Sequence, residues 1–112
     1  MDEDISYDIP YIDKIVPIIN AIASPDQIIL FGSYAKGTYT QKSDIDLLII
    51  KKDLKNGNAI LDSIYRAFYE SKINVSVDLL TIDYKKYNEL NNKIGYIYKT
   101  IKEQGKIIYG TL

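Results

Sequence analysis

Two aspartates separated by a single residue, Asp44 and Asp46, stand at the entrance of an apolar run, residues 45–50. Side chains two positions apart on a strand point to the same face, so the two carboxylates are expected to lie side by side. Unpaired carboxylates at that spacing repel and desolvate each other, and a shared cation removes this cost. Oxygen ligands suit Mg²⁺, which commonly takes one or two carboxylates together with substrate phosphates. The pair therefore predicts a metal site.

The turn before this pair offers groups that suit a phosphate. An apolar run, residues 28–31, ends at Gly32 and Ser33, where a short helix is expected to begin. Its first backbone N–H groups, together with the Ser33 hydroxyl, can bind phosphate oxygens. Ser33 could instead cap the helix. Lys36 is a further candidate phosphate contact, although a loop lysine is often only solvated, and Ser43 is expected to satisfy local backbone groups.

A third carboxylate, Asp78, is the only charge within the apolar run 73–82. Val77 and Leu79 flank it, and an unpaired carboxylate in such surroundings is costly. It could be an aspartate of the core that forms a salt bridge. Alternatively, it lies on a strand next to Asp46 and completes a cluster of three carboxylates.

Helices and strands must position these residues. Apolar residues at three- and four-residue steps predict an amphipathic helix from Pro10 to Ala23, kinked at Pro17. The further expected elements are strands at 28–31, 45–50, 73–82 and 106–109 and helices at 33–36, 59–70, 84–92 and 94–103, with Asp83 as an N-cap. The run 45–50 is apolar on both faces, which is typical of a central strand. The fold class predicted is α/β, a small mixed β-sheet with helices packed against it.

Composition limits the chemistry. The 112 residues predict a single domain over 1–112, with the acidic stretch 1–9 as a partly ordered leader. A net charge of −1 offers no field for nucleic acid or an anionic membrane, so neither is expected to bind directly. The absence of histidine and cysteine removes Ser-His and Cys-His catalysis as well as thiolate and imidazole metal sites. With an acidic N-terminus and no long apolar run, the protein is expected in the cytoplasm.

The spacing of the two motifs is similar to that of a known superfamily. Gly32-Ser33-x-Ala35-x-Gly37, followed after five residues by Ser43-Asp44-x-Asp46-Leu47, resembles the signature of nucleotidyltransferases related to DNA polymerase β. At this length the chain resembles the minimal nucleotidyltransferases, whose members are often encoded beside a HEPN-domain protein. The resemblance implies a nucleotidyltransferase fold in which Asp44, Asp46 and Asp78 bind metal. It leaves open whether Asp78 is a ligand, the general base or both.

Together these features predict transfer of a nucleotide. Two Mg²⁺ ions would be held by Asp44, Asp46 and Asp78, and Gly32 and Ser33 would position the β- and γ-phosphates of ATP while a hydroxyl attacks the α-phosphorus. The resemblance implies an antitoxin that transfers AMP to a tyrosine of a HEPN ribonuclease toxin. Two alternatives stay open: a small-molecule (aminoglycoside-type) nucleotidyltransferase, and a binding module that inhibits its partner sterically.

The aromatic residues are unusually biased toward tyrosine. The chain has eleven tyrosines, two phenylalanines and no tryptophan. Tyrosines suit both interfaces and the margins of helix–sheet packing. A tyrosine near the site could also stack on a nucleobase, but the sequence does not indicate which one. Nor does it give the base, the acceptor or the oligomeric state.

Overall fold

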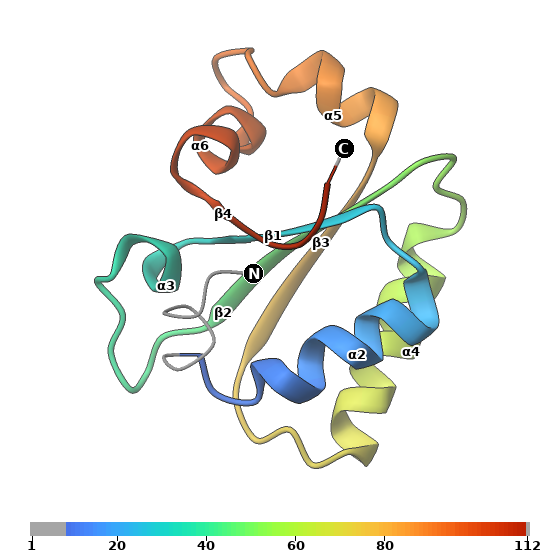
Figure 1. The fold of residues 1–112 in the computed structure, drawn as a ribbon, viewed down its shortest axis with the longest axis vertical. Coiled ribbons are helices and arrows are strands. Elements are labelled where there is room, and N and C mark those ends of the chain that lie inside the picture. The colour runs from blue at the N-terminus through green and yellow to red at the C-terminus, as the bar shows by residue number, and fades with distance from the viewer. Residues whose placement is uncertain (1–8, 112) are drawn as a thin grey trace.

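The computed structural model describes residues 9–111, and it has the predicted α/β fold class. Four strands form one mixed sheet in the order β3-β2-β1-β4 (Figure 1). The strands are β1 (Gln27–Phe31), β2 (Ile45–Lys51), β3 (Val77–Asp83) and β4 (Lys106–Gly110). β2 pairs in parallel with β3 and antiparallel with β1, which pairs antiparallel with β4. The predicted central position of β2 is therefore confirmed.

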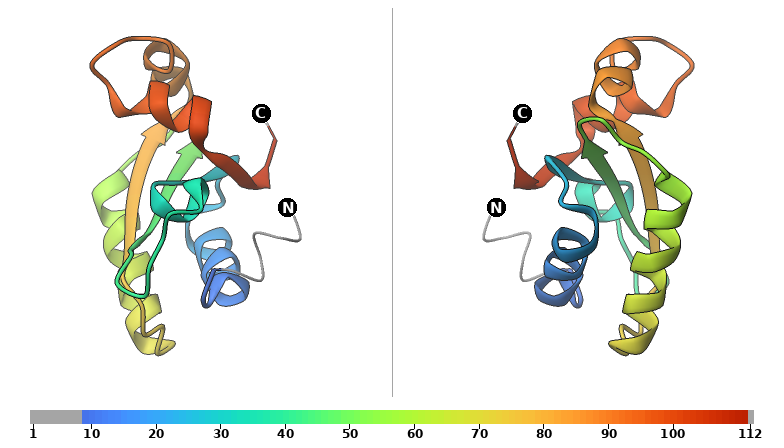
Figure 2. Two further views of the ribbon diagram at one scale, coloured as in Figure 1. Left: turned by 90° about the vertical axis from the view of Figure 1, so that its left-hand side faces the viewer. Right: turned by 90° about the vertical axis from the view of Figure 1, so that its right-hand side faces the viewer.

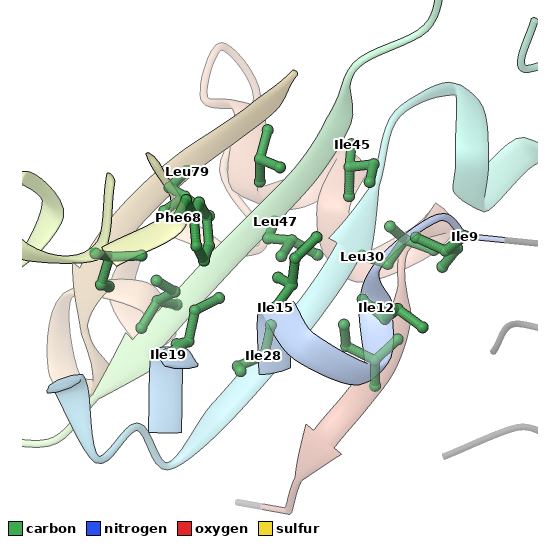
Figure 3. Close-up of a cluster of buried hydrophobic side chains, with 14 of the residues drawn as sticks. Ile9, Ile12, Ile15, Ile19, Ile28, Leu30, Ile45, Leu47, Phe68 and Leu79 are labelled. Atoms are coloured by element: carbon green, nitrogen blue, oxygen red, sulfur yellow. The ribbon is translucent and has the colours of Figure 1, made fainter. Parts of the chain in front are cut away.

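One face of the sheet is covered by two helices, α2 (Ile12–Ala23) and α4 (Gly57–Glu70), which lie side by side (Figure 1). Their inward positions recur at helical spacing, so each helix presents one apolar stripe to the strands. Ile15 and Ile19 of α2 and Ile64 of α4 are fully buried there. Figure 3 shows these helices packing on Ile28, Leu30 and Leu47 of the strands. This continuous core holds β1 and β2 in place beneath the loop that joins them.

The opposite face is covered only at one end. Helices α5 (Tyr84–Leu90) and α6 (Ile97–Gln104) lie at the end toward which β2 and β3 run (Figure 2). There they bury a second cluster in which Leu48, Ile50 and Ile82 of the strands pack with Tyr87 and Ile101 of the helices. The beginning of β2 and β3 on this face is left open.

Several element boundaries differ from those predicted. The third strand begins at Val77 rather than at residue 73. Its register pairs Val77 with Ile45, the first residue of β2, and the ladder ends with the bond from the Ile45 N–H to the Ser76 carbonyl (2.9 Å). Ile73 and Val75 instead pack partly buried against the core. Helices α5 and α6 are also shorter than predicted, because the connection between them occupies residues 91–96.

The chain before α2 was predicted to be a leader. Residues 1–8 lie outside the described residues, and Ile9, the last residue of that predicted stretch, is buried in the core. Pro17 lies within α2, as expected. Within residues 9–111, no helix is both long enough and apolar enough to cross a membrane.

Candidate active site

Asp46 and Asp78 are direct neighbours across the parallel strands. The register pairs Asp46 with Asp78, and the pairs on either side are Ile45 with Val77 and Leu47 with Leu79. Those four apolar side chains are buried on the α2–α4 face, which leaves both aspartates on the opposite, open face. A register slip of one residue would turn the apolar side chains outward, so the core fixes this pairing. The structure thus places Asp78 on the strand next to Asp46, as predicted.

The charges of this cluster act on Asp46. Burial raises the pKa of Asp46 to about 6, with further contributions from the negative charges of Asp78 and Asp44 and from a hydrogen bond with the Asp78 carboxyl group. Among residues 9–111 the one salt bridge joins Lys99 to Glu103, on α6. The alternative that Asp78 is a salt-bridged core residue is wrong, because its side chain is exposed. No lysine or arginine among residues 9–111 forms an ion pair with Asp44, Asp46 or Asp78.

Asp44 lies one residue before β2, with an exposed side chain. The loop that delivers it is closed by Ser43, whose Oγ accepts a hydrogen bond from the Thr40 backbone N–H (2.8 Å). The predicted local role of Ser43 is therefore confirmed. Asp44 is close enough for its charge to raise the pKa of Asp46.

The aspartates fit a metal ion that takes its remaining ligands from water and substrate phosphates. Within the part of the chain that the structure describes, no three acidic, histidine or cysteine side chains are arranged to hold an ion on their own. Mg²⁺ seldom uses such a closed protein cage, since it is usually held by one or two carboxylates with water and substrate phosphates. Asp46 and Asp78 in register, with Asp44 beside them, meet that requirement.

Gly32 ends β1 immediately beside Asp46. Its backbone has a φ of +73°, and the residue before it, Phe31, pairs with Asp46 across the strands. A Cβ atom at Gly32 would overlap Oδ2 of Asp46 and lie 3.0 Å from its Cγ. Glycine is thus required twice, by the left-handed φ and by the close approach of the carboxylate.

The remaining predicted residues lie on α3 (Ser33–Lys36). Gly32 is the N-cap and Ser33 is the first helical residue, so the alternative that Ser33 caps this helix is wrong. Ser33 is half-buried beside Gly32, whereas Lys36 is exposed at the end of α3. No hydrogen bond or ion pair between described residues joins Lys36 to the aspartates. Gly37, at a φ of +76° with open space around it, ends the helix.

Tyr65 supports β3, and the sequence did not indicate this role. The N–H of Leu79, next to Asp78, donates to the hydroxyl of Tyr65 on α4 (2.9 Å). β3 is an edge strand, so an outward N–H needs a partner from outside the sheet. A tyrosine on the margin of a helix stripe gives no sign of this contact in the sequence.

A hollow of about 680 Å³ adjoins Asp44. Tyr34 and Tyr39 are among its lining residues, and their rings stack with centroids 4.5 Å apart and planes at 11°. We call it the Asp44 hollow. It is lined by Pro10, Tyr34, Tyr39, Thr40, Gln41, Lys42, Ser43, Asp44, Asn74, Val75 and Ser76.

Comparison with known proteins agrees with this geometry. Residues 12–108 match the model of the nucleotidyltransferase domain family. The chain belongs to this family. The predicted enzyme class, a nucleotidyltransferase, is therefore confirmed.

Its relatives include proteins of Methanocaldococcus jannaschii that carry the name "Putative protein adenylyltransferase". One is 32% identical over 84 residues, which is 74% of this chain and 77% of the relative. Another is 43% identical over 54 residues, which is 44% of this chain and 37% of that protein.

Solved structures share the fold. A crystal structure of a toxin–antitoxin with AMP-PNP superposes with a TM-score of 0.65 at 26% identity, covering 88% of this chain and 73% of that one. A mutant of the toxin–antitoxin MntA-HpeT gives 0.63 at 25% identity, with the same coverage of both chains. This mutant carries two aspartate-to-glutamate substitutions, two positions apart.

Proposed function

We propose that this nucleotidyltransferase moves AMP from ATP to a tyrosine hydroxyl of a partner HEPN-domain toxin, with Mg²⁺, and so acts as the antitoxin of the pair. The observation that carries the proposal is the Asp46–Asp78 register on the uncovered half of the sheet. The relatives named as protein adenylyltransferases support a protein acceptor. The likeness to toxin–antitoxin structures, one of them with an ATP analogue, supports both the toxin partner and ATP.

The three aspartates would hold the metal. Asp44, Asp46 and Asp78 would hold the Mg²⁺ together with water and the substrate phosphates. When bound, the ions neutralise the triphosphate and lower the pKa of the attacking hydroxyl. The spacing of the substituted aspartates in the MntA-HpeT mutant is that of Asp44 and Asp46 here, which supports a role for this pair.

The other residues would orient the nucleotide. Gly32 leaves room for the Asp46 carboxylate, and Ser33 beside it would bind the β- and γ-phosphates through its hydroxyl and backbone N–H. Lys36 would add a phosphate contact when the triphosphate is present. The acceptor hydroxyl would approach from the β3 side, where the Asp78 carboxylate can take its proton. Its oxygen would bond to the α-phosphorus as the bond to the β-phosphate bridging oxygen breaks, and pyrophosphate would leave on the Ser33 side. Positioning and charge neutralisation then provide most of the rate enhancement.

The test is label transfer from α-labelled ATP. The purified protein, Mg²⁺ and the product of the neighbouring gene are incubated together, alongside the variant Asp44→Ala/Asp46→Ala. We expect label on the partner with the wild type and none with this variant. Asp62→Ala/Glu70→Ala, which removes two exposed charges of α4, is the matched control and should transfer normally.

Two outcomes would contradict the proposal. If no protein is labelled and both the wild type and the aspartate variant still bind and inhibit the partner, the chain is a steric binding module. If label appears only on an added aminoglycoside, the chain is a small-molecule nucleotidyltransferase.

A further inference from the structure

The Asp44 hollow adjoins the aspartates but has no part in the reaction described so far. Its volume, about 680 Å³, falls within the range of small-molecule sites. Tyr39, whose side chain is 38% exposed, presents the accessible ring of the stacked pair, since Tyr34 packs against the core. Aromatic and polar groups therefore line one hollow beside a catalytic carboxylate.

The geometry of transfer restricts what this hollow can receive. In an in-line displacement the attacking and leaving oxygens lie on opposite sides of the phosphorus. With the α-phosphorus over Asp46, the pyrophosphate toward Ser33 and the acceptor toward Asp78, this line runs across the strands, from β1 to β3. The nucleoside must then leave along the strand direction or away from the sheet.

Along the strands, the two directions differ in what a nucleoside would meet. Toward the carboxyl ends of β2 and β3, Leu48, Ile50 and Ile82 on the same face are buried with Tyr87 and Ile101 of the helices. Leu80, which follows Asp78 on this face, is an apolar side chain that is 37% exposed. Figure 2 shows α5 and α6 gathered at this end of the sheet. In the other direction lie Asp44 and the Asp44 hollow.

We propose that the Asp44 hollow binds the nucleobase of the substrate, stacked on Tyr39. This inference rests on the proposed function, which fixes the line of transfer. A planar base fits against a tyrosine ring, and such stacking is tolerant of base identity. The amides of Gln41 and Asn74, which also line the hollow, each offer a donor and an acceptor to the polar edge of the base. Tyr39 and these amides then determine which nucleotide is used.

The experiment separates base binding from phosphate binding. Isothermal titration measures AMP-PNP and inorganic tripolyphosphate, each with Mg²⁺, against the wild type, Tyr39→Ala and Tyr39→Phe, with and without the partner. We expect Tyr39→Ala to weaken AMP-PNP about tenfold, the loss expected from removing one stacked aromatic ring. Tripolyphosphate, which has no base, should bind unchanged. Tyr39→Phe keeps the ring and should bind both as the wild type does.

Tyr69→Ala is the matched control, because this tyrosine is 85% exposed on α4 and does not line the Asp44 hollow. Unchanged AMP-PNP binding by Tyr39→Ala overturns the inference, and so does an equal loss for both ligands. Loss of transfer to the partner with AMP-PNP binding intact would also overturn it, assigning the hollow to the acceptor.

These outcomes are distinguishable from failure of the proposed function. If the selective loss of AMP-PNP is found but no protein is ever labelled, the base site stands and the protein acceptor is wrong. If label is transferred normally and Tyr39→Ala binds AMP-PNP like the wild type, the protein acceptor stands and the base site is wrong.

Discussion

The sheet face that carries Asp46 and Asp78 has two halves, which differ in burial and in the chemistry of their side chains. Where α5 and α6 cover it, Leu48, Ile50 and Ile82 are buried, and the strands there contribute to the core. Where the helices are absent, the same strands carry Asp46 and Asp78, on a surface open to solvent. One pair of strands thus supplies both core and site, and the boundary between the two is set by where the covering helices lie.

The other face explains why the open half stays ordered. Beneath the aspartates, Ile45, Leu47, Val77 and Leu79 are buried against α2 and α4. Each carboxylate is therefore flanked in sequence by residues that the core holds. The site has solvent access without depending on a flexible loop for the placement of Asp46 and Asp78.

The largest expected effect concerns activity in the open half. Replacing Asp46 by asparagine should lower the rate of AMP transfer by about a thousandfold, because it removes a carboxylate from the centre of the cluster. The fold should survive, since the side chains that fix the register are unchanged. Single-turnover label transfer measures the rate and circular dichroism checks the fold. A variant that keeps a tenth of the activity would exclude the assigned role.

In the covered half the expected effect is on stability. Leu48→Ala removes a fully buried side chain and should lower the free energy of unfolding by about 2–5 kcal/mol. Leu80→Ala, on the same face but 37% exposed at the open half, should cost less than about 1 kcal/mol. Urea denaturation compares the two. Equal losses would mean that the two halves do not differ as described.

Gly32→Ala should affect both properties. The positive φ costs about 1 kcal/mol in strain, and the added Cβ must also displace the Asp46 carboxylate. We expect unfolding to be easier by about 1–3 kcal/mol and transfer to fall by about a hundredfold. Gly37→Ala is the matched control, because it has a similar φ with open space around it. If both variants lose the same activity, the contact with Asp46 does not matter.

Several features of the fold and of the candidate site could be predicted from the sequence. The apolar runs around Asp46 and Asp78 indicated buried strands, and the fixed spacing from Gly32 to Asp46 indicated that the turn at Gly32 and the aspartate pair belong to one site. These signals are local, because they depend on strand periodicity and on one turn. The N-cap at Asp83 was likewise predicted, and its side chain accepts the Lys85 N–H (2.9 Å).

What the sequence did not reveal depends on contacts between distant segments. β3 starts at Val77 because β2 starts at Ile45. Asp78 is exposed because α5 and α6 cover only the far end of the sheet. The support of β3 by Tyr65 has the same origin, since it joins residues far apart in the chain. No pattern within a single segment carries that information.

The smallest expected effect is a pH dependence of stability. Because the pKa of Asp46 is raised to about 6 from an ordinary 3.8, the folded state keeps a proton that the unfolded chain releases between these values. Its stability should therefore fall as pH rises through that window, by about 1 kcal/mol after allowance for solvent screening. Asp46→Asn removes this contribution, so urea denaturation at about pH 4 and about pH 8 should show a smaller decrease for the variant than for the wild type. Above the window, Mg²⁺ should restore stability to the wild type by binding the charged cluster, but much less to the variant. If Mg²⁺ stabilises both equally, the repulsion in the open half is not relieved at Asp46, and the ion binds elsewhere.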